Sequence, residues 1–167
     1  MITRFLTLFS ALLFATFITN SPAHAEAKVG DAFGDWMFGC QALSAKNTIC
    51  SISQSMINND THQRILNLSL SKRGTNKQLV LIVTAPLGLY IPAGITAMID
   101  GKNPFKLILQ SCSQSGCVAA INIDKPTEQA LKNGNVLGIL FSPDASGNPF
   151  LVNASLKGVT QGLNALQ

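Results

Sequence analysis

Apolar and polar residues alternate along most of the chain with the period of two that is typical of β-strands. The clearest case is Gln63–Ser71, where three leucines at alternate positions are separated by asparagine and serine. Leu79–Thr84 is instead continuously apolar and rich in β-branched residues, which predicts a strand buried on both faces. The same two criteria predict further strands at Asp35–Cys40, Ile49–Met56, Ile95–Ile99, Phe105–Gln110, Ala119–Asp124, Val136–Phe141 and Phe150–Leu156.

Two connections between these stretches predict short helices. Asp124 is suited to cap a helix that has Pro126 in its first turn and stops at Gly134, and a second helix is predicted over Val159–Leu166. About nine closely spaced strands with one or two short helices predict an all-β fold, a β-sandwich. Residues that favour turns or tolerate positive φ lie at Asn58–Asp60, Arg73–Asn76, Asp100–Gly101, Asn133–Asn135 and Ser142–Pro149.

The first 25 residues differ from the rest of the chain. Arg4 precedes the apolar stretch Phe5–Ile18, and Ala23-His24-Ala25 fits a small-residue cleavage site. We therefore expect residues 1–25 to be a cleaved signal peptide, so that the exported chain begins at Glu26. An uncleaved anchor is the alternative, but 14 residues fall short of the roughly 20 needed to span a bilayer. No later apolar run exceeds five residues, so no membrane span is predicted in the mature protein.

Composition narrows the class of protein further. Charged residues make up 12% of the chain, against about 25% in ordinary soluble domains, and the formal net charge is +4. The chain is too apolar to be disordered and too weakly basic to indicate nucleic-acid binding. Serine, asparagine, glutamine and threonine form the polar faces of the predicted strands. We expect residues 26–167 to form a single β-sandwich domain, since this length can bury a hydrophobic core.

Export changes the interpretation of the four cysteines. An even number of cysteines in an oxidising compartment predicts two disulfides, and four cysteines allow three pairings. The pairing Cys40–Cys50 with Cys112–Cys117 is favoured, because each pair flanks a short loop and can staple adjacent strands. The spacing fits no standard zinc-ligand pattern, and the C-x-x-C motif of redox enzymes is absent from the sequence.

Few residues are candidates for catalysis. His62 is the only imidazole after residue 25, and its place in a polar turn indicates a solvated side chain. Asp31 and Asp35 are the closest pair of carboxylates, but Asp35 precedes a predicted strand, where a turn or capping role is usual. No nucleophile elbow, zinc helix, phosphate loop or dinucleotide motif occurs. The sequence therefore predicts no catalytic residue, no cofactor and no metal site.

Two further features have both a structural and a functional interpretation. Lys72, Arg73 and Lys77 are the only basic cluster, which indicates either a solvated hairpin tip or a weak contact with an anionic surface. Trp36, the sole tryptophan, is expected to pack in the core beside a disulfide, with ligand stacking as the alternative.

Short motifs follow one another along the chain in a characteristic order: Phe33-Gly34-Asp35-Trp36, Cys40, Cys50 with Gln54, Pro86-Leu87-Gly88-Leu89, Ile91-Pro92-Ala93-Gly94-Ile95, Ile99-Asp100, Cys112, Gly116-Cys117-Val118-Ala119 and Ser155-Leu156-Lys157-Gly158. In this order and spacing the chain resembles the invasion-associated locus B family of exported bacterial proteins. One departure is Val159, where many relatives have phenylalanine. The resemblance implies an immunoglobulin-like β-sandwich in the periplasm, at the outer membrane or outside a Gram-negative cell. It brings no catalytic residue, cofactor or ligand.

Two functional hypotheses follow from export, the predicted fold and this resemblance. The leading one is a non-enzymatic envelope or secreted protein that binds another protein or a cell-surface component, with peripheral outer-membrane association and a role in host-cell invasion and virulence. The alternative is a periplasmic accessory factor for the assembly of envelope proteins. A carboxylate hydrolase built around Asp35 is a third, more remote hypothesis.

Overall fold

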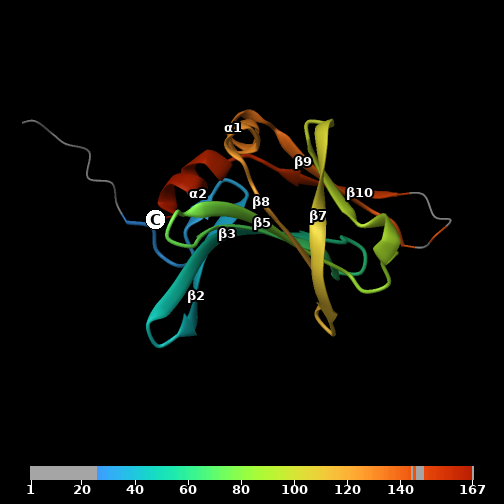
Figure 1. The fold of residues 1–167 in the computed structure, drawn as a ribbon, viewed down its shortest axis with the longest axis horizontal. Helices are drawn as coiled ribbons and strands as arrows, with labels where there is room; N and C mark the ends of the chain where they lie inside the picture. The colour runs from blue at the N-terminus through green and yellow to red at the C-terminus, as the bar shows by residue number, and fades with distance from the viewer. Residues whose placement is uncertain (1–25, 144, 146–148, 167) are drawn as a thin grey trace, which may run out of the picture.

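Ten antiparallel strands form the framework of the protein in a computed structural model, which describes residues 26–143, 145 and 149–166 (Figure 1). The strands are hydrogen-bonded in the order β1-β2-β3-β4-β5-β8-β7-β6-β9-β10. Their bounds are β1 Ala32–Phe33, β2 Trp36–Ser44, β3 Asn47–Ile57, β4 Arg64–Arg73, β5 Gln78–Ala85, β6 Ile95–Ile99, β7 Lys102–Ser113, β8 Gly116–Asn122, β9 Val136–Phe141 and β10 Phe150–Ser155.

Strand β7 belongs to both layers of this framework. Its first half pairs with β6, and its second half pairs with β8. Strands β1 to β5 with β8 therefore make one layer, β6 with β9 and β10 make the other, and β7 joins them along one side (Figure 1). The inward side chains of both layers form one hydrophobic core, which includes Leu68 and Leu81 from the first layer and Ile139 from the second. The predicted all-β, immunoglobulin-like sandwich with two disulfides is confirmed.

Strand positions agree closely with the alternation of the sequence. Ile95–Ile99 and Val136–Phe141 have the predicted bounds. The prediction that Leu79–Thr84 is buried on both faces is wrong in part. Leu79, Leu81 and Val83 are buried in the core, but on the other face only Val80 is buried, and Ile82 and Thr84 are half-buried. The reason is that this outer face of β5 borders an open groove rather than another layer.

Both predicted helices are present and lie beside one another at one end of the sandwich (Figure 1). Helix α1 (Lys125–Asn133) begins where the Asp124 carboxylate accepts a hydrogen bond from the Thr127 amide at 2.9 Å, and it ends at Gly134. Helix α2 (Val159–Ala165) buries Val159 and Leu163. The short strand β1 and a single 3₁₀ turn, η1 (Ile91–Ala93), were not predicted from the sequence. No helix in the described part of the chain is long and apolar enough to cross a membrane.

The open side of the sandwich is closed by side chains that bind the end of β10. The amide oxygen of Gln54 on β3 accepts a hydrogen bond from the Ser155 amide at 3.0 Å, and its Nε2 donates to the Ser155 carbonyl at 3.2 Å. The indole Nε1 of Trp36 donates to the same carbonyl at 2.9 Å. Trp36 is 1% exposed, so it is the core residue that the sequence indicated. We call these three residues the Gln54 clasp.

Two backbone segments pack against each other beside this clasp. The amide of Asp35 donates to the Lys157 carbonyl at 3.1 Å, which brings the turn after β1 onto the segment after β10. Gly158 has φ +88°, and a Cβ atom there would overlap the carbonyl of Phe33. Glycine is required at this position for both reasons, because only glycine adopts this φ without strain and leaves space for the neighbouring backbone.

Replacement of Gly158 tests this contact. Gly88 is a matched control, because it has the same φ of +88° but no atom lies within 4 Å of a Cβ placed there. Each alanine variant loses about 1–2 kcal/mol from the left-handed backbone. We expect Gly158→Ala to lose about 2 kcal/mol more than Gly88→Ala, measured by urea unfolding, because only Gly158→Ala must separate the two backbones. Equal losses would contradict the close packing.

Candidate binding surface

Two disulfides staple the two long hairpins of the first layer. Cys40 and Cys50 are bonded and lie directly opposite each other on β2 and β3, and Cys112 and Cys117 are bonded and lie opposite each other on β7 and β8. This is the pairing that the spacing in the sequence favours. The two hairpins project on the same side of the sandwich (Figure 1), so the bonds keep both projections from fraying.

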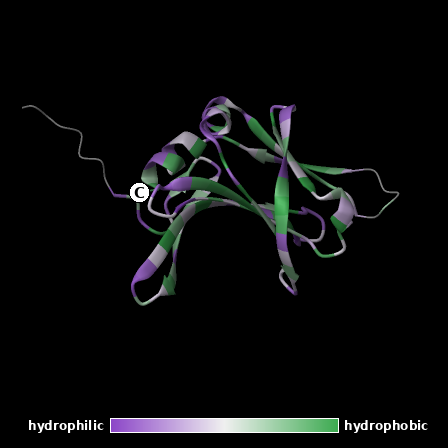
Figure 2. Ribbon diagram, viewed as in Figure 1, coloured by the Kyte–Doolittle hydropathy of each residue, from purple (hydrophilic) through white to green (hydrophobic). Residues whose placement is uncertain are grey.

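The outer face of the first layer curves between these hairpins (Figure 1), and we call it the concave face. The strand register places Ser53, Ser69, Ile82, Ala120 and Ile108 in one row across β3, β4, β5, β8 and β7. The row changes from polar to apolar halfway across. Small polar side chains cover β3 and β4, whereas aliphatic side chains cover β5, β8 and the middle of β7, which is strongly hydrophobic in Figure 2.

The apolar half of the concave face contains a groove of about 530 Å³, which we call the trough. This volume lies within the range of about 300–1,000 Å³ that is typical of ligand sites. Its side chains come from β4, β5, β7 and β8. They are Arg73, Val80, Ile82, Ile108, Gln110, Val118, Ala120, Ile121 and Asn122.

The structure separates the basic residues that are neighbours in the sequence. Lys72 points away from the trough, and its Nζ donates to the Leu166 carbonyl at 2.6 Å. Burial lowers the pKa of Lys72, and the nearby Glu128 carboxylate opposes this shift. Arg73 lines the trough and donates from Nε to the Ser71 hydroxyl at 3.3 Å, and Lys77 lies exposed in the following turn. The three cations therefore do not form one basic patch.

The candidate catalytic residues Asp31, Asp35 and His62 lie in turns and loops, outside the strands and helices. His62 is exposed in the turn between β3 and β4, where its backbone has φ +53°. The carboxylate of Asp31 accepts a hydrogen bond from the Lys28 amide at 2.8 Å and so stabilises the turn between these two residues. Among the described residues, no three His, Cys, Asp or Glu side chains are close enough to hold a metal ion. Trp36 is buried and is therefore unable to stack on a ligand.

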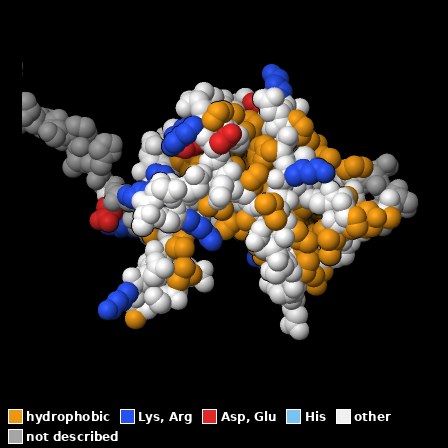
Figure 3. All heavy atoms as spheres, viewed as in Figure 1, with side chains coloured by type: hydrophobic (Ala, Val, Ile, Leu, Met, Phe, Trp, Pro, Cys, Tyr) orange, Lys and Arg blue, Asp and Glu red, His pale blue; other side chains and the backbone are white. Residues whose placement is uncertain are grey.

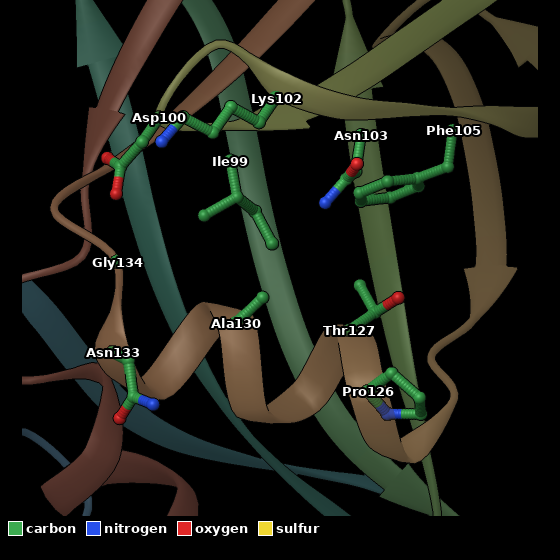
Figure 4. A pocket seen from close by; sticks show the side chains of 10 residues that line it. All are labelled: Ile99, Asp100, Lys102, Asn103, Phe105, Pro126, Thr127, Ala130, Asn133 and Gly134. Atoms are coloured by element: carbon green, nitrogen blue, oxygen red, sulfur yellow. The ribbon is translucent and has the colours of Figure 1, made fainter.

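A second, smaller cleft lies between α1 and the β6–β7 hairpin (Figure 4). Its volume is about 270 Å³, and Ile99, Phe105 and Ala130 supply apolar side chains to it. Asp100 points to one end, but its carboxylate already accepts hydrogen bonds from the amides of Asn135 and Val136 at 3.0 and 2.9 Å. These bonds fix the connection to β9, so we interpret Asp100 as structural.

A further apolar surface lies at the end of the molecule that carries η1 and the start of β10 (Figure 3). Tyr90, Ile91, Phe150 and Leu151 are 37%, 56%, 52% and 50% exposed there. Exposed apolar side chains that gather in this way mark contact surfaces more often than isolated ones do.

Sequence patterns did not reveal these surfaces. The alternation along β7 shows that Ile108 lies on the face opposite Leu107, but not which strands lie beside it. The order β5-β8-β7 places strands from three separate parts of the chain side by side, and this order is set by tertiary packing. The one signal in the sequence was the run Leu79–Thr84. Its apolar residues occupy successive positions, so they place apolar side chains on both faces of a strand.

The fold and the surface together define a disulfide-stapled β-sandwich with an uncovered, partly apolar sheet face. The family model for the invasion associated locus B (IalB) protein matches residues 36–167, and the chain belongs to this family. No curated protein matches the chain.

The fold is shared with a solved structure. It is described as the crystal structure of invasion associated protein B from Bartonella henselae. The two chains superpose with a TM-score of 0.71 at 20% sequence identity, and the match covers 80% of this chain and 91% of that one. The family resemblance seen in the sequence is thereby confirmed.

Tryptic mapping without reduction tests the disulfide pairing. Trypsin cleaves after Lys46, so the Cys40–Cys50 bond is expected to join peptide 29–46 to peptide 47–64. Cys112 and Cys117 lie in the same peptide, 107–132, which is expected to appear alone with both cysteines oxidised. A linked species of 29–46 with 107–132 would show a different pairing. Reduction is expected to cost about 2–3 kcal/mol of stability for each bond.

Proposed function

We propose that this protein is exported and acts without catalysis, by binding another protein or a cell-surface component through its concave face. The main support for the proposal is a strip of aliphatic side chains on the outer face of the disulfide-bonded sheet. Ile108, at its edge, is 67% exposed, although residues of this kind are usually buried. The disulfides hold the flanking hairpins in place before binding, which lowers the entropy cost of association.

Export is part of the proposal. Two disulfides fit an oxidising compartment, and we propose a periplasmic, outer-membrane-associated or secreted location. The proposed signal peptide, residues 1–25, lies outside the described residues, and cleavage after Ala25 leaves Glu26 as the first residue of a single domain.

The proposal extends to a role in host-cell invasion. Its support is membership in a family named for invasion and the fold shared with a protein of that name. We propose that the concave face contributes by contact with a host-surface or envelope component.

Site-specific photocrosslinking in living cells tests the proposed surface. A photoreactive residue at Ser55, on the concave face, is expected to yield a covalent adduct with a partner, because this side chain is exposed and lies two residues from Ser53 on the same face of β3. Gln161, exposed on α2, is the matched control position and is expected to yield none.

The identity of the adduct decides between the two functional hypotheses. An adduct with a host-cell component supports the invasion role. In that case, a strain that lacks this protein should enter host cells less efficiently. An envelope-assembly protein supports the periplasmic accessory role instead. Adducts from Gln161 but not from Ser55 would contradict the assignment of the concave face.

A further inference from the structure

The trough runs along β8, where Ala120 has the shortest of the outward side chains that line it. Val118, Ala120 and Asn122 face outward on β8, and Ile82 and Ile108 stand opposite Ala120 on either side. Val118 and Asn122 are four residue steps apart along the strand, which gives the trough a length of about 13 Å. Ile82 and Ile108 therefore form the two walls of the trough beside Ala120, and the trough is open to solvent.

From Cys117 to Ala120, the floor of the trough presents no free main-chain hydrogen-bonding groups. Strand β8 is paired with β5 from Cys117 to Asn122 and with β7 from Gly116 to Ala120. An extended peptide pressed onto this floor would lose water from its own amides without gaining partners, at a cost of about 1–3 kcal/mol for each buried group. An alkyl chain has no polar group to desolvate and gains free energy in proportion to the apolar area that it buries. The floor thus favours an aliphatic occupant over a peptide.

One end of the trough is cationic. Arg73 is the only charged residue among those that line it, and it lies near Val80 and Asn122 because β4, β5 and β8 are paired there. Its hydrogen bond to Ser71 uses Nε, so within the part of the chain that the structure describes the terminal nitrogens of the guanidinium group remain available to a ligand. The other end has the neutral amide of Gln110. A guanidinium group binds carboxylates with charge-assisted hydrogen bonds, so the charge selects an anionic head at this end.

We propose that the trough binds one single-chain aliphatic carboxylate of the fatty-acid class. Its alkyl chain lies along β8 over Ala120, and its carboxylate contacts Arg73. The proposal rests on the assignment of the concave face as the binding surface and names the chemistry that its apolar half accepts.

Isothermal titration of the purified, disulfide-bonded protein with sodium dodecanoate, below its micelle concentration, tests the proposal. One saturable site is expected. Ala120→Phe fills the middle of the trough and is expected to weaken binding at least tenfold. Gln161→Phe is the control, because it adds the same side chain at an exposed position on α2, away from the trough, and it is expected to leave binding unchanged. Equal binding by both variants would overturn the proposal.

The charge is tested separately, with variants that leave the apolar floor intact. Arg73→Gln is expected to weaken dodecanoate binding about tenfold, and Arg73→Lys less than this. Lys77→Gln removes an equal charge from the same hairpin without touching the trough, and it is expected to have no effect. Dodecan-1-ol, which has the same chain and no charge, is expected to bind more weakly than dodecanoate and to be insensitive to Arg73→Gln.

Two results would overturn the proposal even if Ala120→Phe failed to fold. One is the absence of saturable dodecanoate binding, and the other is an equal response of dodecanoate to Arg73→Gln and Lys77→Gln. Neither result bears on photocrosslinking from Ser55, which tests the concave face independently. The failure of the fatty-acid inference and the failure of the proposed function are therefore distinguishable.

Discussion

The pairing of one glutamine side chain with one strand end holds this sandwich closed. Strand β10 is the last strand in the hydrogen-bonded order, so its outer edge has no neighbouring strand. Gln54 supplies an amide that donates and accepts at Ser155 as a neighbouring strand would, and Trp36 adds a third hydrogen bond. Strand β7 connects the layers on one side only. The Gln54 clasp connects them on the other, and the shared core depends on both connections.

Two of the motifs that carry the family resemblance, together with Gln54, are explained by this closure. Phe33-Gly34-Asp35-Trp36 and Ser155-Leu156-Lys157-Gly158 lie at opposite ends of the described chain, and the fold brings their backbones into contact. Gln54, which follows Cys50 by four positions, lies between them. These residues therefore specify how the chain closes on itself. They are structural residues, so the proposed binding function must depend on surfaces elsewhere on the molecule.

That closure leaves the outer face of the first layer uncovered. Both helices lie at one end of the sandwich, and the two stapled hairpins stand at the sides of the concave face. A sheet face of this kind is normally polar, as it is over β3 and β4. The change to valine, isoleucine and alanine over β5 and β8 is the departure that indicates binding, because contiguous apolar side chains on a surface mark sites where another molecule covers them.

The sequence by itself determined the local features: strands such as Ile95–Ile99, the cap at Asp124, the burial of Trp36 and the favoured disulfide pairing. Each depends on neighbours within a few residues or on hydrophobicity alone. The features that depend on which strands are neighbours were decided only by the tertiary structure. It turned Lys72 away from Arg73, placed Ile82 opposite Ala120 and brought Gln54 to Ser155. These contacts join residues far apart in the chain, and alternation with a period of two assigns each residue to a face but not to a neighbour.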